Sequence, residues 1–243
     1  MAEMRQSDRS RLSRLLPILP AVIILAAAGA AADKKARSEE GEFKISFAGR
    51  EIGSERFTIA TSDDAVQSTS VVSFRNPQNP QQKITLETRL GMSGRFVPTS
   101  YELKSEAGGK TGTVVGRFSP NQVIFEYSGT GDSVRRGLLV GDEYTVLDTN
   151  VFHHFTFLVR LFEGKGKETG GRFEVVIPQE NDSGFLRMKE LEKETIVAGG
   201  KKIRCRRFQV DSDAVSIELW ADDQQRLQKI AVPDRKIEVV RSN

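Results

Sequence analysis

The stretch KITLETRL, residues 83–90, alternates between apolar and polar residues. Its inward candidates Ile84, Leu86, Thr88 and Leu90 stand at every second position, and charged or polar residues stand between them. Such alternation places one face of a β-strand against a core and the other face in water. The stretch therefore predicts a half-buried strand.

The same alternation extends in both directions along the chain. It is present in EFKISF (42–47) and FVPTSYEL (96–103), and it returns in RFEVVIP, AVSIELWADD, RLQKIAV and KIEVVR. Turn clusters such as AGREIG, NPQNPQQ and EAGGKTG separate the runs, about 10 to 15 residues apart, which is the spacing of hairpins joined in a meander. The chain is predicted to be mainly β and antiparallel.

One segment breaks the period of two. In DTNVFHHFTFLVRLFEG, residues 148–164, the apolar residues form one broad helical stripe: Val151, Phe152, Phe155, Leu158, Val159 and Phe162. This spacing predicts a helix over 149–162, with Asp148 or Asn150 as its N-cap.

An apolar helix needs cover, and the concave side of a twisted sheet is the large surface available. We therefore predict a strongly curved antiparallel meander sheet, or incomplete barrel, with one apolar α-helix packed inside. A transmembrane barrel is the alternative use of so many strands. Aromatic residues make up 7% of the chain and form no paired girdles, which disfavours that alternative.

The N-terminal segment has the layout of a signal peptide. Four arginines precede the apolar run LLPILPAVIILAAAGAAA, which ends in small residues suited to cleavage after Ala30 or Ala32. An uncleaved anchor is the alternative, because the run reaches the lower limit for a spanning helix. The predicted organisation is a signal peptide (1–32), a flexible mature N-terminus (33–41) and a single β-rich domain (42–243). The protein is expected to be exported, either periplasmic or secreted, with no integral membrane domain after cleavage.

Composition excludes several classes of function. The formal charge is +3, of which the N-terminal segment supplies +2, so the mature part is near neutral and has no general attraction for nucleic acid. A single cysteine forms no internal disulfide, and the fold must be stable through its core. We predict no cofactor.

The two histidines of the chain, His153 and His154, are candidates for chemistry but weak ones. Adjacent helical residues point about 100° apart, so they cannot hold one metal ion as an i, i+4 pair can. We expect His154 to flank the apolar stripe and His153 to face outward or meet a strand edge. Neither a metal site nor a catalytic residue is predicted.

The basic run KKIRCRR, residues 201–207, is the strongest surface feature. On a strand, Lys202, Arg204 and Arg206 share one face, while Cys205 points to the other as a small core residue. This face is either ordinary solvated surface or a basic patch for anionic envelope components. Trp220, at the end of a strand, is either a lid on the core or a ring that faces a ligand.

Three segments together indicate a family resemblance: FAGREIGSERFTI, TIVAGGKKIRCRRFQV and IELWADDQQRLQKIAV. The chain resembles uncharacterised exported bacterial β-sheet proteins of unknown function. These are similar in general form to the periplasmic lipoprotein carriers, whose curved sheet encloses a helix and an apolar cavity. The resemblance transfers no catalytic residue.

These observations favour a non-enzymatic binding or carrier-like protein for a lipid-like or other hydrophobic ligand. The expected ligand-binding residues are Phe152, Phe155, Val159, Phe162 and Trp220, although the same helix stripe would serve equally well as core packing. The alternative is a structural or interaction protein of the cell envelope that holds a partner through sheet edges or the basic patch. A hydrolase with His154 as base is a third hypothesis.

Overall fold

The computed structural model describes residues 37–165 and 170–243; the predicted signal peptide, residues 1–32, lies outside them. The first strands are β1 (Arg37–Phe47), β2 (Arg50–Thr61), β3 (Ala65–Asn76), β4 (Asn79–Ser93), β5 (Pro98–Ala107), β6 (Lys110–Ser119), β7 (Gln122–Ser128), β8 (Val134–Leu139) and β9 (Tyr144–Val146). After the helix come β10 (Arg172–Ile177), β11 (Asp182–Glu190), β12 (Glu194–Ala198), β13 (Lys201–Asp211), β14 (Ser216–Ala221), β15 (Leu227–Val232) and β16 (Ile237–Arg241).

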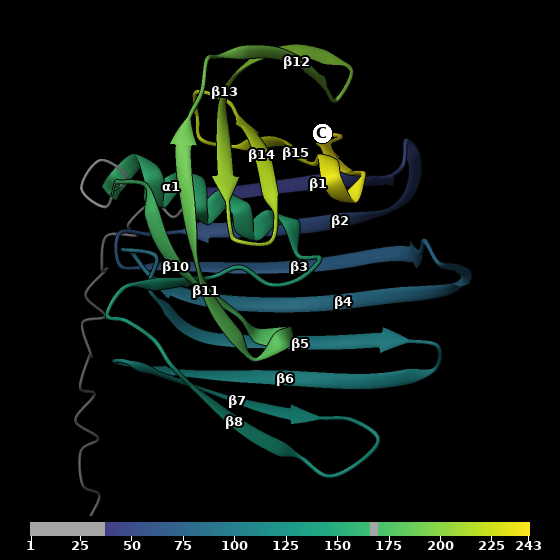
Figure 1. The fold of residues 1–243 in the computed structure, drawn as a ribbon, viewed down its shortest axis with the longest axis vertical. Coiled ribbons are helices and arrows are strands. Elements are labelled where there is room, and N and C mark those ends of the chain that lie inside the picture. The colour runs from purple at the N-terminus through teal and green to yellow at the C-terminus, as the bar shows by residue number, and fades with distance from the viewer. Residues whose placement is uncertain (1–36, 166–169) are drawn as a thin grey trace, which may run out of the picture. The chain divides into compact units, whose positions relative to one another are not determined.

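The strands form one large curved sheet that does not close into a barrel. Its order is β8-β7-β6-β5-β4-β3-β2-β1-β16-β15-β14-β13-β11-β10-β9, with β12 paired to β13 outside this path. Successive strands pair antiparallel, and the pairing of β9 with β10 is parallel. Figure 1 shows β1 to β8 as a layer of long strands, with the helix and the later strands on one side of it. The predicted fold class is confirmed.

A short 3-10 helix, η1 (Phe152–His154), leads directly into α1 (Phe155–Lys165). The helical segment begins later than the predicted residue 149, and neither Asp148 nor Asn150 caps it. Val151 is the N-cap and makes no side-chain cap bond. Asn150 adopts φ +62° in the preceding turn, and the Asp148 carboxyl accepts hydrogen bonds from Thr149 and Gln179 instead.

The helix fills the concave side of the sheet. Every residue from Val151 to Val159 is buried, and the apolar ones share one cluster with Phe43, Leu90 and Phe125 of the sheet. Burying a side chain of this size contributes about 1.5–3 kcal/mol. Within the described residues, no helix is long and apolar enough to cross a membrane.

The first strand begins at Arg37, inside the segment predicted as the mature N-terminus (33–41). Residues 37–41 pair with residues 57–61 of β2. The Glu39 carboxylate binds Arg160 of α1 at 2.6 Å and Arg241 of β16 at 2.7 Å. These ion pairs hold a polar stretch in the sheet although its sequence lacks apolar alternation.

A second, smaller core lies beside the β12–β13 hairpin. It consists of Ile196, Ala198, Cys205 and Trp220, with Ile203, Ala231 and Val240 at its border. Cys205 is 0% exposed, as expected for a small core residue. Strand β12 covers Trp220 and Cys205. The sheet therefore has apolar packing on both of its faces at β13 and β14.

Candidate functional site

An apolar pocket of about 380 Å³ lies where the β1–β2 and β3–β4 turns meet the start of the helical segment. Its walls are Ile45, Phe47, Ile52, Phe74, Phe152 and Ile237, with Pro77 and three amide side chains, Asn76, Gln78 and Asn150, beside them. Ile45 and Phe152 are buried and form the deeper part, whereas Pro77, Gln78 and Asn150 are exposed. The pocket therefore has an apolar interior and a polar, uncharged rim.

A buried carboxyl group holds Phe152 in place. Oε2 of Glu55 accepts hydrogen bonds from the backbone N–H groups of Phe152 (2.9 Å) and His153 (3.0 Å). Its Oε1 lies 2.6 Å from Nδ1 of His153, and both side chains are fully buried. Glu55 therefore fixes the start of the helix, and with it one wall of the pocket, to strand β2.

The structure corrects the expected positions of both histidines. His153 does not face outward or meet a strand edge; it is 0% exposed, because Glu55 supplies a buried partner. Its Nε2 lies 3.2 Å from Oγ of Ser68. His154 does not merely flank the stripe either: it is 1% exposed, and its Nδ1 accepts the Asp148 N–H at 3.3 Å.

A second group of buried polar side chains adjoins the first. The Tyr101 hydroxyl donates to the Asp148 carboxyl, and the ring of Tyr101 lies edge-on to His154 at 6.2 Å between centroids. Burial raises the pKa of Asp148, and burial together with Asp148 raises the pKa of Tyr101. Burial and the neighbouring His153 lower the pKa of His154, which favours its neutral form.

Ser68, His153 and Glu55 stand in the order of a nucleophile, a base and the group that orients the base. All three are closed to substrate, since Ser68 is 2% exposed and the other two are 0% exposed. The arrangement thus satisfies buried polar groups and ties the helix to β2 and β3. No three His, Cys, Asp or Glu side chains within residues 37–165 and 170–243 could hold a metal ion.

The structure separates the predicted ligand-binding residues. Phe152 lines the apolar pocket. Phe155 and Val159 pack in the main core, and Phe162 packs against Phe173 and Phe208. Trp220 belongs to the second core, where its Nε1–H donates to Glu194 at 2.9 Å. Trp220 is 5% exposed in this core.

The three residues of the predicted basic patch differ in exposure and in partners. Lys202 and Arg204 are exposed. Arg206, by contrast, lies between two carboxylates, those of Glu190 on β11 and Glu163 on α1. Arg206 is half-buried, and its two carboxylate partners offset its charge.

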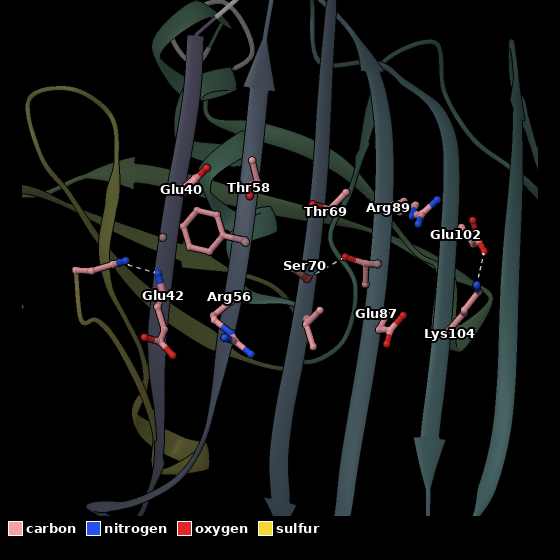
Figure 2. Close-up of a pocket in the computed structure, with 15 residues that line it drawn as sticks. Glu40, Glu42, Arg56, Thr58, Thr69, Ser70, Glu87, Arg89, Glu102 and Lys104 are labelled. Carbon is pink, nitrogen blue, oxygen red and sulfur yellow. Dashed lines mark hydrogen bonds and ion pairs between the residues drawn. The ribbon is translucent and has the colours of Figure 1, made fainter.

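Two larger hollows differ from the apolar pocket in chemistry. One, of about 540 Å³, lies over β1 to β5 on their outer face (Figure 2). Opposite charges face each other across its strands: Glu42 with Arg56, Glu87 with Lys104, and Arg89 with Glu102. Such cross-strand pairs are typical of a solvated sheet face. The other hollow, of about 580 Å³, is lined by Arg37, Glu39, Arg160, Asp223 and Arg226 among others.

Sequence reasoning missed five of the six apolar walls and also Glu55. Phe47 and Ile52 flank a turn, where apolar side chains can lie at the open end of a sheet. Glu55 occupies the same inward series as Phe57 and Ile59, so it is a charged residue at a core position. A charged residue in an inward series is visible in the sequence, but the sequence does not show which residues pair with it.

Comparisons with known proteins support the fold and leave the function open. The chain is similar to a β-barrel-like protein of domain of unknown function DUF1849 from Brucella abortus, with TM-score 0.56, 9% identity, and coverage of 85% of this chain and 95% of that one. A DUF1089 family protein from Pseudomonas aeruginosa gives TM-score 0.42 and 12% identity, covering 74% of this chain and 90% of that one. No protein-family model and no curated protein matches the chain.

Proposed function

We propose that the protein is an exported, non-enzymatic binding protein for a small hydrophobic ligand, and that the apolar pocket is its binding site. The observation that carries the proposal is the lining: six apolar side chains around about 380 Å³, with amides at the rim. Small-molecule sites have volumes of about 300–1,000 Å³, mostly apolar walls and a few polar groups.

The construction of the pocket supports this function. Its walls come from paired strands and from a helix start held by Glu55, so the site is formed before a ligand arrives. A preformed site loses little conformational entropy on binding. Export is supported by the basic, apolar and small-residue order of the N-terminal segment, and a carrier role by the resemblance to periplasmic lipoprotein carriers.

The test is to fill the pocket. Ile52 is half-buried in its wall, and Ile52→Trp places a large ring in the space. We expect the mature protein to bind the neutral apolar dye N-phenyl-1-naphthylamine with a fluorescence increase, and the variant to bind it about tenfold more weakly or worse. Val197→Trp is the matched control, since Val197 is 62% exposed and lies on β12 outside the pocket.

Equal dye binding by Ile52→Trp and Val197→Trp would place the dye elsewhere and contradict the proposal. Absence of dye binding by the unaltered protein would favour the second candidate function, an interaction protein of the cell envelope. The observation behind that candidate is the edge strand β8, whose residues are exposed except for half-buried Leu138. Leu139 at its end is 83% exposed, and an open edge presents backbone groups that can pair with another chain.

A further inference from the structure

We propose that the pocket selects an uncharged amphiphile: a single apolar chain that carries an amide, hydroxyl or ester head rather than a carboxylate, phosphate or ammonium head. This inference rests on the proposed function and adds the class of ligand.

Among the described residues that line the pocket, none carries a charged side chain. Its polar members are the amides of Asn76, Gln78 and Asn150. An ionised head group that leaves water for such a rim loses hydration and gains no ion pair in return. A neutral head group loses much less, because one amide or hydroxyl can replace its hydrogen bonds to water.

Two of the three amides have hydrogen-bonding capacity to offer. Asn76 is already engaged, since its Nδ2 donates to Gln82 at 3.0 Å and its Oδ1 accepts the Gln78 N–H at 3.0 Å. The exposed side chains of Gln78 and Asn150 make no hydrogen bond to another described residue. Each amide can both donate and accept, which matches a head group that does the same.

The usual anion-binding groups near this pocket are occupied. Free N–H groups at the start of a helical segment attract anions. Here the N–H groups of Phe152 and His153 already donate to Oε2 of Glu55, a carboxyl group that belongs to the protein. An anionic ligand would find neither a free donor there nor a cation in the lining, so the site is unfavourable for fatty acids and phospholipid phosphates.

The experiment compares head groups on one chain. Displacement of N-phenyl-1-naphthylamine from the mature protein is measured near neutral pH with lauryl alcohol, lauramide, laurate and laurylamine, below their aggregation concentrations. Displacement gives a dissociation constant for each compound. We expect the constants of the alcohol and the amide to be lower than those of the two charged compounds by a factor of about ten or more. Laurate or laurylamine binding as tightly as lauramide would overturn the proposed selectivity while leaving an apolar site. Failure to bind the dye at all would instead overturn the proposed function.

A charge placed at the rim provides a second test. Gln78→Lys supplies the missing cation, and we expect it to strengthen laurate binding severalfold relative to lauramide. Gln67→Lys makes the same chemical change at an exposed position of β3 outside the pocket lining and should leave the ratio unchanged. If Gln78→Lys does not alter the ratio, the head group does not lie at this rim and the proposal is wrong.

Discussion

At the scale of single residues, the unusual feature is a glutamate in the core. Glu55 stands in the inward series of β2, and the N–H groups that satisfy it come from residues 97 and 98 positions later in the chain. Hydrogen bonds to a charged group contribute about 1.5–3 kcal/mol, and breaking a buried pair costs more than the pair gains on forming. Glu55 is therefore a positioning residue for the helix start and for Phe152.

Replacing Glu55 with glutamine tests this role. Glu55→Gln keeps the volume but turns one acceptor into a donor that faces His153, and we expect the free energy of unfolding in urea to fall by about 2–4 kcal/mol. The control is Glu51→Gln, because Glu51 on the same strand forms an exposed pair with Lys44 at 3.1 Å. It should cost less than about 1 kcal/mol. Equal unfolding midpoints for the two variants would contradict the role assigned to Glu55.

At the scale of elements, periodicity identified the strands and the helix, but not their ends or their partners. Alternation correctly placed Phe43 and Ile45 inward, and the helical stripe marked the segment that forms α1. The helix start was misplaced because Asp148 has partners, Tyr101 and Gln179, that no local pattern reveals. Start and end positions depend on tertiary contacts, whereas the period depends on burial alone.

The candidate site was the least predictable part for the same reason. Its walls come from β1, β2, β3, the helix start and β16, segments that span residues 45 to 237. The alternation of apolar and polar residues indicates that Ile45 and Phe74 face away from water. It does not indicate which apolar residues pack against each other and which line a pocket. Of the residues expected to bind a ligand, Phe152 is the one that lines this pocket, because it lies near the start of the helical stripe.

The β12–β13 hairpin gives a prediction about its thiol. Burial, and then the nearby acidic groups Asp222, Asp223 and Glu194, raise the pKa of Cys205 to about 11. Because the thiolate is the reactive form, Cys205 should react with Ellman's reagent near neutral pH only after urea unfolds the protein.

Uncovering the thiol provides the test of this protection. Ile196→Ala removes part of the cover and should speed modification several-fold, while Val197→Ala, at the exposed neighbouring position, should not. Rapid labelling of the unaltered folded protein would show that the hairpin does not protect Cys205.

At the scale of the whole molecule, the three tyrosines of the chain lie on three strands, and each has a raised pKa. Burial is the largest cause in every case, and it raises the pKa of Tyr127 to about 12. The tyrosines of the unfolded chain lose their hydroxyl protons near pH 10, and those of the folded protein lose them at higher pH. The stabilising effect is therefore complete below about pH 10 and is lost as pH rises toward 12.

An alkaline titration measures this effect. We expect tyrosinate absorbance of the native protein to stay low at pH values where the urea-unfolded protein is largely ionised, and the free energy of unfolding to decrease above about pH 10. Tyr127→Phe should weaken that decrease, because the Tyr127 hydroxyl donates to the Pro178 carbonyl at 2.7 Å in the folded state. Superimposable titration curves for folded and unfolded protein would contradict the shifts.

The pairing of β1 with β16 has a consequence for the order of folding. Strands β1 to β8 each pair with the next strand in sequence, and so do the hairpins among β10 to β15. Each of these two parts can therefore form from contacts of low sequence separation. The seam between Phe43 and Arg241 joins residues almost two hundred positions apart and closes the largest loop. We therefore expect β1 to β8 and β10 to β15 to form as two half-sheets, and the molecule to become one cooperative unit only when residues 237–241 pair with β1.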